Sequence, residues 1–404
     1  MADPETEAPF VPTPASPDIR RRCPFSPPQN YEELRDRGRL GRYALPDGSE
    51  AWLVTSQTDA ATVLTDRRFS SGINMAFLSE GEGAAPGWLF GLDAPEHGRL
   101  RRLLSPHFGA RALAHMQPRI ASFARERLDR IAAAGGPADL MVEYAWPLPG
   151  LIVHDLLGVP EEVREEVEQR LAVGDDATRS PEERLGAFRN TWQALLEFVE
   201  GRKPGAGDDL LDKLLGWGSG DDEARLTPPE AASLVLSLRL GGQAPVAHTF
   251  AMGVFRLLAQ DGDLTSLPLD DEAQLDRVVD ELLRYVPSNN LGVVRTVSED
   301  LMLNGRAIPA GSRVYVNLPV VNRDPKRWPR ADEMDLGRDG ASHLAFGYGA
   351  HRCLGHHLAR LELRILLREL ALRFPHLGLA CPPEEVPREV TTMTFGIAEL
   401  PVVW

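Results

Sequence analysis

Cysteine is scarce in this sequence: its 404 residues contain three cysteines, Cys23, Cys353 and Cys381. An odd number of cysteines spread over a long chain is not the pattern of a secreted disulfide framework. A positive charge balance is also lacking, because 59 Asp and Glu outnumber 44 Lys and Arg and give a formal net charge of −15. Nucleic-acid binders usually carry a basic domain or stripe. The composition predicts a cytoplasmic protein that acts on small molecules or proteins and not on nucleic acid.

The chain also lacks an uninterrupted apolar run that could span a bilayer. Its most apolar long stretch, residues 231–258, is interrupted by charged, polar and helix-disfavouring residues: Arg239, Gly241, Gly242, Gln243, Pro245 and His248. This pattern indicates a long buried helix and no membrane association. Residues 1–22 are rich in Pro, Ala and acids and have no basic start followed by an apolar core. They predict a disordered arm before a single domain of residues 23–404.

Helical periodicity dominates what is present. Apolar residues recur at three- and four-residue spacing in seven segments, which are residues 96–104, 117–134, 160–173, 181–200, 228–258, 272–285 and 356–374. Strand-like segments are short, and they include residues 51–55, 292–297, 313–318 and 391–397. Thr227, Pro228 and Glu230 combine an N-cap, a proline at the first helical position and the acid of a capping box. The sequence therefore predicts one mainly α domain with a small β lobe.

One cysteine lies in an unusual setting. The segment Phe346-Gly-Tyr-Gly-Ala-His-Arg-Cys353-Leu-Gly355 leads directly into a helix with regular apolar positions. The dipole and N–H groups of a helix N-terminus favour a thiolate, and the glycines let the backbone pass close to a flat cofactor. These features suit a thiolate ligand of haem iron. Two alternatives are a buried cysteine in a glycine-rich turn and a zinc site made of Cys353, His356 and His357.

This cysteine segment resembles the haem-binding loop of the cytochrome P-450 family, specifically of its soluble bacterial members. Other segments match the family in the same order: Glu281 and Arg284 resemble its Glu-x-x-Arg helix, and Arg338 resembles the second arginine of that ion network. The resemblance spans about residues 25–404. It implies a single-domain cytochrome P-450 fold that binds haem b through Cys353, with Glu281, Arg284 and Arg338 in structural roles.

The same resemblance assigns the remaining haem contacts. His97 and Arg101 stand four residues apart in a segment similar to the helix that holds the haem propionates, so they share one helix face and present two donors to a carboxylate. The resemblance implies that Arg295 and His351 complete the binding of the propionates. It adds two further cofactor-binding residues, Phe346 and Gly355.

The central helix departs from its family. Members usually carry an acid and a threonine that assist proton delivery to iron-bound dioxygen, after the pattern Ala/Gly-Gly-x-Asp/Glu-Thr. This chain carries Ala244 and Pro245 at those two positions, after Gly242 and Gln243. Proline cannot donate to the carbonyl of Gly241, so we expect the helix to open locally there. His248, four residues after Ala244, is a candidate for the same face, although a histidine in a long helix is more often a packed core residue.

The resemblance also places a substrate pocket between residues 73–90, the central helix near Arg239 and Gln243, residues 288–293 and residues 393–395. The candidate substrate contacts are Trp88, Phe90, Arg239, Asn289, Asn290, Val293, Met393 and Phe395. Their aromatic and amide groups predict a bulky apolar substrate that carries some hydrogen-bonding groups. Packing of the loops is the alternative role for several of them.

A basic cluster is expected around the cysteine, made of Arg99, Arg101, Arg102, Arg352, His356, His357, Arg360 and Arg364. Besides binding propionates it could dock an acidic ferredoxin, which with its reductase would supply electrons; an ordinary charged helix face is the alternative.

The sequence thus predicts an oxidative enzyme of specialised metabolism, a monooxygenase that uses dioxygen to oxidise a hydrophobic small molecule. Oxidative ring coupling, dehydrogenation and peroxide-driven oxidation are alternatives on the same haem. A haem protein that binds a ligand without turnover is the alternative from another class.

Overall fold

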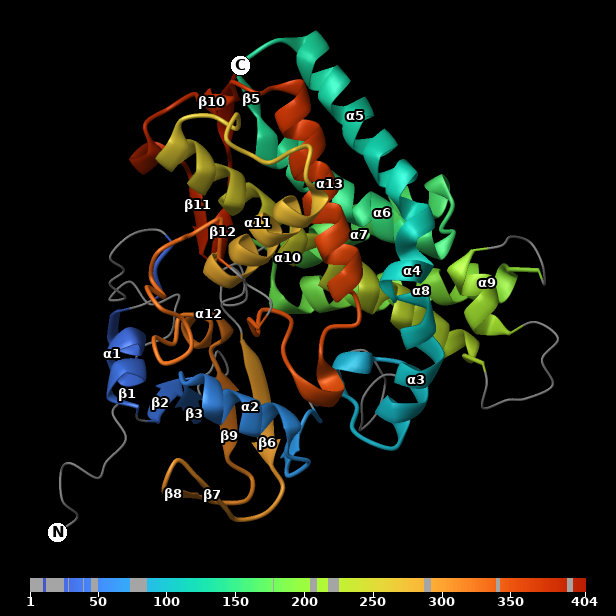
Figure 1. Ribbon diagram of the computed structural model, residues 1–404. Helices are drawn as coiled ribbons and strands as arrows, with labels where there is room; N and C mark the ends of the chain where they lie inside the picture. Colours follow the sequence, from blue (N-terminus) through green and yellow to red (C-terminus); the bar gives the residue numbers. More distant parts are fainter. Residues whose placement is uncertain are drawn as a thin grey trace. The chain divides into compact units, whose positions relative to one another are not determined.

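The computed structural model describes residues 10–11, 25–27, 29–38, 40–44, 50–72, 86–176, 178–203, 209–216, 225–286, 292–338, 342–390 and 395–404. Within them the chain forms two compact units, each discontinuous in sequence (Figure 1). Unit 1 comprises Met1–Ser70, Gln117–Pro147 and Ala244–Trp404. Unit 2 comprises Ser71–Met116 and Leu148–Gln243.

Unit 1 holds every strand of the described residues. Its main sheet has the order β1-β2-β3-β9-β6-β4, made of β1 (Phe10–Val11), β2 (Gly41–Ala44), β3 (Glu50–Val54), β9 (Arg313–Val316), β6 (Val293–Val297) and β4 (Phe69–Ser70). The smaller sheets are β10-β13-β5, β11-β12 and β7-β8, made of β10 (Gly378–Leu379), β13 (Pro401–Val403), β5 (Ala138–Asp139), β11 (Arg388–Val390), β12 (Phe395–Ile397), β7 (Leu301–Leu303) and β8 (Arg306–Ile308).

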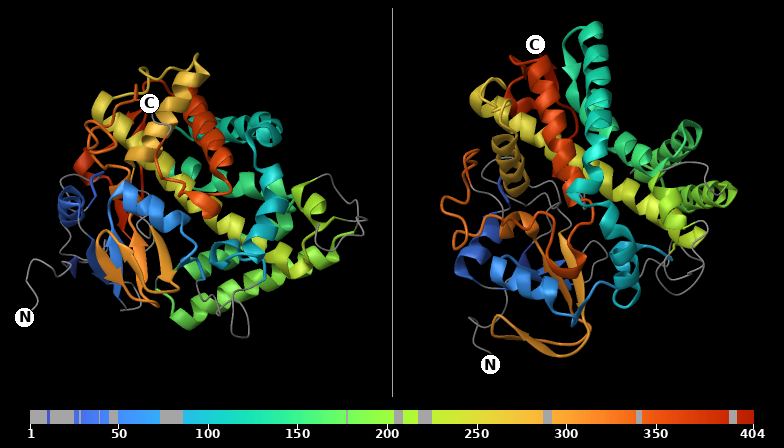
Figure 2. Two further views of the ribbon diagram at one scale, coloured as in Figure 1. Left: turned by 60° about the horizontal axis from the view of Figure 1, so that its bottom comes forward. Right: turned by 45° about the vertical axis from the view of Figure 1, so that its right-hand side comes forward.

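Unit 1 also contains several of the long helices. Its helices include α1 (Gln29–Arg37), α2 (Gln57–Thr65), α5 (Gln117–Ala134), the second half of α10 (Pro228–Asp261), α11 (Glu272–Tyr285), α12 (Leu318–Val321) and α13 (His356–Arg373). Helix α13 lies alongside α5 and also packs against α11 (Figure 2). The cysteine segment ends at Gly355, directly before α13. The packing of α13 therefore fixes the position of the segment's C-terminal end.

The described part of unit 2 is entirely helical. Its α-helices are α3 (Glu96–Leu104), α4 (Ala110–Leu113), α6 (Pro147–Leu157), α7 (Glu161–Asp175), α8 (Pro181–Gly201), α9 (Leu210–Leu215) and the first half of α10. Helices α7 and α8 pack against each other.

The capping box predicted for α10 is present: the Thr227 amide donates to Glu230 Oε2 at 2.8 Å, and the Glu230 amide donates to Thr227 Oγ1 at 3.4 Å.

The main sheet of unit 1 is held by burial of its apolar side chains. Leu53, Val54, Val314 and Val316 of the neighbouring strands β3 and β9 are fully buried. The Tyr43 and Tyr315 rings stack at 4.5 Å between centroids. Burial of such side chains contributes roughly 1.5–3 kcal/mol each, which anchors the sheet that carries Arg295 in β6.

The mainly α composition with a small β part agrees with the sequence analysis. Three predicted helices, over residues 96–104, 117–134 and 272–285, have the bounds of α3, α5 and α11. Three predicted strands correspond to β3, β6 and β9 within one or two residues. The fourth predicted strand, residues 391–397, is described only from residue 395 onward, where it forms β12.

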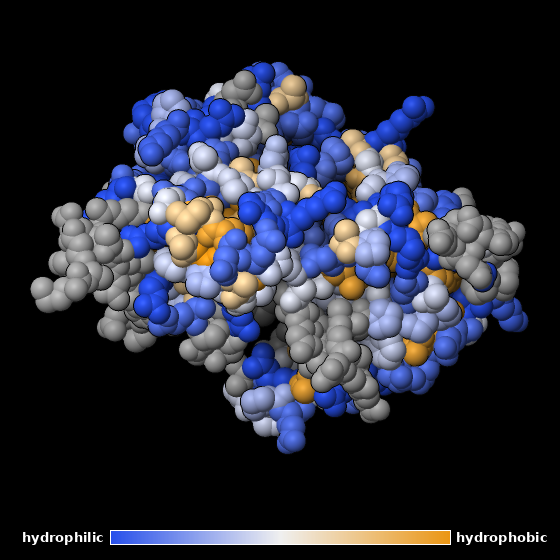
Figure 3. Space-filling view, turned by 90° about the horizontal axis from the view of Figure 1, so that it is seen from below, coloured by the Kyte–Doolittle hydropathy of each residue, from blue (hydrophilic) through white to orange (hydrophobic). Residues whose placement is uncertain are grey.

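The surface is largely hydrophilic on the face drawn in Figure 3, where hydrophobic residues gather only in small separate groups. Among the described residues, no helix combines the length and apolarity needed to cross a membrane.

Candidate active site

Cys353 lies in a tightly turned segment between a 3₁₀ turn, η7 (Gly349–His351), and α13. Three backbone hydrogen bonds shape this segment: Gly347 to Leu344 at 2.8 Å, Arg352 to Gly349 at 3.1 Å and Cys353 to Phe346 at 2.8 Å. Gly347 and Gly349 have φ of +68° and +73°, a conformation that glycine adopts without steric cost. The Cys353 side chain is exposed. The segment thus leaves Cys353 exposed, just before a helix N-terminus.

Gly349 is required for a second reason. A Cβ atom at this position would lie 2.4 Å from the carbonyl oxygen of Leu64, at the end of α2. Any other residue would push the segment away from α2. At Gly347 and Gly355 an added Cβ would meet nothing within 4 Å. Their backbone is therefore open on the side where a side chain would stand, which is compatible with close approach of a flat group.

The Phe346 ring lies against Arg360 and His343, and Asp280 of α11 holds both of them. The Arg360 guanidinium of α13 lies 4.7 Å from the centre of the Phe346 ring and donates to Asp280 of α11 at 2.7 Å. The His343 ring is 5.9 Å from the Phe346 ring, and its Nε2 is 3.3 Å from Asp280. Burial alone raises the pKa of Asp280, but the hydrogen bond with His343 and the charge of Arg360 hold this pKa below its usual value. These contacts tie the cysteine segment to α11 and α13.

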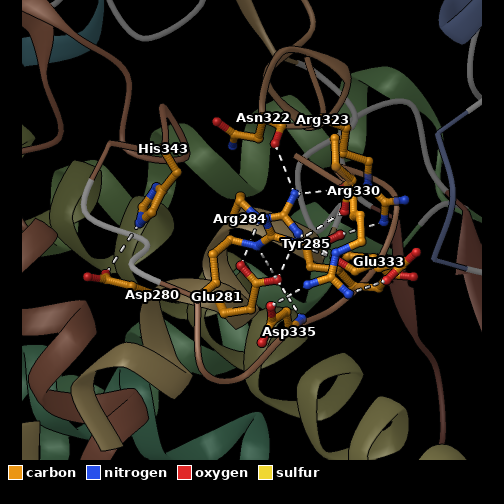
Figure 4. Close-up of polar contacts among 12 residues, drawn as sticks. Asp280, Glu281, Arg284, Tyr285, Asn322, Arg323, Arg330, Glu333, Asp335 and His343 are labelled. Atoms are coloured by element: carbon orange, nitrogen blue, oxygen red, sulfur yellow. Dashed lines mark hydrogen bonds and ion pairs between the residues drawn. The ribbon is translucent and has the colours of Figure 1, made fainter. Parts of the chain in front are cut away.

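The predicted ion network of Glu281, Arg284 and Arg338 is present in unit 1 (Figure 4). The fully buried Arg284 donates to both carboxylate oxygens of Glu281, at 2.7 and 2.8 Å, and Arg338 donates to Glu281 Oε1 at 3.2 Å. Arg284 also donates to the carbonyls of Asn322, Ala331 and Glu333. This bidentate, fully hydrogen-bonded pair fastens α11 to the chain before the cysteine segment, a structural role.

The predicted propionate ligands lie on regular elements in both units. In unit 2, His97 and Arg101 both belong to α3, with His97 buried and Arg101 half-buried, so the predicted common helix is confirmed. In unit 1, Arg295 is buried in β6 and His351 is half-buried in η7. Arg295 Nη1 donates to the Val294 carbonyl at 2.9 Å. The binding of a propionate by these four residues stays a prediction.

Helix α10 continues through Pro245 without interruption, so the local opening predicted there does not divide the helix. The Thr249 hydroxyl donates to the Pro245 carbonyl at 2.6 Å. Unit 2 ends at Gln243 and unit 1 resumes at Ala244. In unit 2, Gln243 is buried and Gly242 faces Val153 of α6, where an added Cβ would lie 2.9 Å from a methyl group.

His248 is a packed core residue. Its side chain is 2% exposed, and its ring is 5.8 Å from the Trp146 ring in an edge-on arrangement. Nδ1 has no hydrogen-bond partner among the described residues. Burial lowers the pKa of His248 to about 4, so the imidazole is neutral at pH 7. It is therefore a poor source of a proton.

The substrate candidates of unit 2 have definite partners. Trp88 is buried and lies edge-on to Phe90 at 6.0 Å, while Phe90 is 50% exposed. An added Cβ on Gly241 would lie 2.9 Å from the tip of the Phe90 ring, so Phe90 covers α10 at this glycine. Residues 73–85 of the predicted pocket loop lie outside the described residues.

Arg239 has a partner that the sequence did not reveal. Its buried guanidinium forms a two-point ion pair with Glu168 of α7, and Glu168 also accepts a hydrogen bond from His154 Nε2 of α6 at 3.1 Å. Burial works against the carboxylate, but the hydrogen bonds from His154 and Arg239 lower the pKa of Glu168 to about 2. The charge of Arg239 is thus compensated within unit 2, and contact with substrate stays a prediction.

The other substrate candidates are less well defined. Val293 is half-buried in β6 and packs against the core of the main sheet. Asn289, Asn290 and Met393 lie outside the described residues, and for Phe395 only the backbone, in β12, is described.

Two alternatives can be weighed against the structure. No group of three or more His, Cys, Asp or Glu side chains in the described residues could hold a metal ion, which argues against a zinc site at Cys353, His356 and His357.

Within the predicted basic cluster, Arg99 pairs with Glu230, Arg360 with Asp280, and Arg364 with Glu272 and Asp276. Three of its charges are therefore partly neutralised.

A Cβ atom added at Gly396 would lie 2.0 Å from His248 Nδ1, so the glycine fits closely against this ring. Sequence reasoning missed this fit and the bridge from Arg239 through Glu168 to His154. A lone glycine inside the strand-like segment of residues 391–397 was a usable signal, because such a glycine often marks close approach of another group. Residues 154, 168 and 239 are far apart in sequence, and no local pattern connects them.

Comparison with known proteins identifies the class. The family model described as Cytochrome P450 matches residues 259–402. Cytochrome P450 105C1 of a Streptomyces species is 37% identical over 380 residues, which cover 94% of this chain and 96% of that protein. Nocardicin C N-oxygenase of Nocardia uniformis subsp. tsuyamanensis is 35% identical, covering 95% of this chain and 98% of that protein.

A solved structure agrees with these relatives. The crystal structure of SgvP, described as a putative thioether synthase involved in the tailoring step of griseoviridin, is 32% identical and superimposes with a TM-score of 0.87, covering 98% of this chain and all of that one. The chain belongs to the cytochrome P450 family. It has the mainly helical, single-domain fold of these enzymes with small sheets, and it is an oxidoreductase of the monooxygenase type. Membership implies a haem cofactor.

Proposed function

We propose that this chain is a haem b monooxygenase that tailors a hydrophobic or aromatic natural product. The observation that carries the proposal is the presentation of the Cys353 thiol on a glycine-shaped segment at the start of α13. The residues present fit the cofactor, because a cysteine before a helix N-terminus suits thiolate ligation and the open backbone at Gly347 and Gly355 suits a flat ring. When bound, the haem would supply activation of dioxygen.

The roles of individual residues follow from this proposal. Cys353 would hold the iron, and His97, Arg101, Arg295 and His351 would donate hydrogen bonds to the propionates. Hydrogen bonds from arginine to an ionised carboxylate are shorter and stronger than those between neutral groups. Phe346 would pack beside the cofactor, since Arg360 and His343 already fix its ring.

Substrate recognition would use aromatic surface near α10. The half-exposed Phe90 ring over Gly241, backed by Trp88, supports an apolar contact to a bulky substrate. The names of two relatives support the metabolic role: one acts on nocardicin C, and SgvP belongs to the tailoring of griseoviridin. We further propose that the enzyme is cytoplasmic and that a ferredoxin and its reductase supply electrons. Residues 1–22 are proposed to form an arm before the main domain, which contacts the domain where Phe10 and Val11 pair with β2.

Proton delivery is proposed to depend on the substrate or on ordered water. Ala244 and Pro245 carry no acid or hydroxyl, His248 is neutral at pH 7, and the Thr249 hydroxyl already donates to the Pro245 carbonyl. General acid assistance is typically worth roughly a hundred- to ten-thousand-fold, or about 3 to 5 kcal/mol of barrier. A hydroxyl or amine of the substrate, or a substrate carboxylate that relays a proton from ordered water, would supply this proton.

The first test measures dioxygen uptake after candidate substrates are added. Uptake indicates turnover, whereas a ligand that binds without reacting causes none. For a substrate that is turned over, product formed per reducing equivalent is then compared with that of an analogue lacking its polar group nearest the iron. Substrate assistance predicts that this coupling collapses for the analogue while its binding is largely retained. Coupling that stays high with the analogue and falls instead in His248→Ala contradicts the proposal.

Oxidative bond formation is the second candidate function. The missing acid and hydroxyl favour it, because coupling or peroxide-driven oxidation does not need the same proton delivery, and the description of SgvP as a thioether synthase supports it. Mass spectrometry after reaction under ¹⁸O₂ separates the two: hydroxylation adds one labelled oxygen, whereas coupling joins two atoms of the substrate and adds none.

A further inference from the structure

A buried imidazole of α10 lies against the backbone of a β-hairpin within unit 1. Gly396 belongs to β12, which pairs with β11, and Gly396 faces Glu389 across this pair. An added Cβ on Gly396 would lie 2.0 Å from His248 Nδ1 and 2.6 Å from both Cγ and Cε1. Because real Cβ atoms do not approach so closely, only glycine fits here while His248 keeps its position. The imidazole edge therefore rests directly on the strand.

The Trp146 ring also packs against the imidazole, 5.8 Å away at an interplanar angle of 64°, and His248 as a whole is 2% exposed. Since Nδ1 makes no hydrogen bond to the described residues, its contact with the hairpin is steric and not polar. A ring enclosed in this way in the core has little room to retreat. A larger residue at position 396 would therefore displace the hairpin and not the ring.

We propose that His248 is a positioning residue that sets the distance between the β11–β12 hairpin and α10, and through this distance the size of the molecule that binds on the oxygen side of the haem. This inference rests on the proposed function, which assigns the Ala244 face of α10 to that side. Ala244 and His248 are four residues apart, so they lie on the same helix face. A hairpin seated on His248 is therefore one helical turn from the position where the reaction takes place.

The experiment compares two iron ligands of different size, imidazole and 4-phenylimidazole, by titrating the Soret band of the purified holoprotein. In Gly396→Ala the new methyl group pushes the hairpin away from α10, so more room is left for the larger ligand. We expect the ratio of the 4-phenylimidazole Kd to the imidazole Kd to fall about tenfold, and the double variant His248→Ala/Gly396→Ala to return to within about twofold of the wild type.

Gly253→Ala is the matched control. It also introduces a tight contact into α10, at 3.0 Å from a Leu282 methyl group, but away from the hairpin. It should lower stability and leave the ligand ratio unchanged. A structural disturbance of any kind would change the ratio in the control as well, and that result overturns the inference.

The remaining outcomes are also decisive. An unchanged or increased ratio in Gly396→Ala, or a double variant no closer to wild type than the single one, overturns the positioning role. If Gly396→Ala yields no holoprotein, recovery of holoprotein in the double variant supports the steric fit, and lack of recovery contradicts it. Absence of the reduced carbon monoxide band in the wild type would instead refute the proposed function, independently of the ligand ratio.

Discussion

At the scale of single residues, His248 makes the stability of the protein depend on pH. Burial lowers its pKa to about 4 in the folded state, whereas an exposed histidine has a pKa near 6.5. Between these values the unfolded chain binds more protons than the folded one, so folding stability falls as the pH falls. The contribution is fully present above about pH 6.5 and is lost progressively down to about pH 4.

The prediction compares the wild type with His248→Asn by urea unfolding between pH 7 and pH 4. The difference between a pKa near 6.5 in the unfolded chain and one of about 4 in the folded chain corresponds to about 3 kcal/mol in the free energy of unfolding. The variant should lose less stability than the wild type over this range, by up to that amount. His154, whose pKa is also lowered by burial, remains titratable in both proteins and serves as the common background. Parallel pH profiles for the two proteins would show that His248 is not held neutral.

The sequence predicted contacts between residues correctly where the resemblance to the family supplied the partner of each residue. The Glu281–Arg284–Arg338 network and the placement of His97 and Arg101 on one helix were predicted correctly. The partner of Arg239 was not, because Glu168 and His154 come from helices whose mutual packing no local pattern encodes. The lone glycine at position 396 signalled close approach of some group, but no local pattern shows that the group is His248, nearly 150 positions earlier in the chain.

At the scale of elements, the start of α10 depends on the capping box of Thr227 and Glu230. The Thr227 side chain accepts from the Glu230 amide, and Glu230 Oε2 accepts from both the amide and the hydroxyl of Thr227. Removing an N-cap side chain typically costs about 1 kcal/mol, because an N–H of the first turn loses its partner. Helix α10 carries both Ala244 and His248, so its register matters to the site.

We therefore expect Thr227→Ala to lower the free energy of unfolding by about 1 kcal/mol, measured by urea denaturation. Thr62→Ala is the control: Thr62 is exposed in the interior of α2, where alanine is the better helix former, so this variant should be neutral or slightly more stable. Equal losses in both variants would mean that the cap contributes nothing specific to α10.

The long helices were predictable because their apolar residues recur regularly, and in α11 an N-cap adds to this signal. In α5 and α11 the apolar spacing extends over the whole helix, and at α11 the N-cap Asp271 accepts from the Gln274 amide at 3.0 Å. Short elements such as α1, α2 and α6 were not predicted. In α6 the side chains are apolar on nearly all sides, so no amphipathic period distinguishes this helix from a buried strand. Two-residue strands such as β4 and β5 exist only through their partners.

At the scale of the whole molecule, the family fold explains features that composition could not. A family resemblance across residues 25–404 predicted the mainly α domain, and relatives covering 94–95% of the chain confirm the family. The substrate stays a proposal, because several candidate contacts lie outside the described residues. The described ones, Trp88, Phe90, Arg239 and Val293, have partners within the protein. The chemistry of the site is therefore better determined than its specificity.

The central claim is that Cys353 ligates the haem iron as a thiolate. The most direct measurement is the carbon monoxide difference spectrum of the reduced protein, recorded for the wild type, Cys353→His and the control Cys381→Ala. The wild type and Cys381→Ala should show the red-shifted band typical of thiolate ligation, and Cys353→His should lose it even where haem is retained, because imidazole supplies no anionic donor. A red-shifted band that survives in Cys353→His would contradict the assignment.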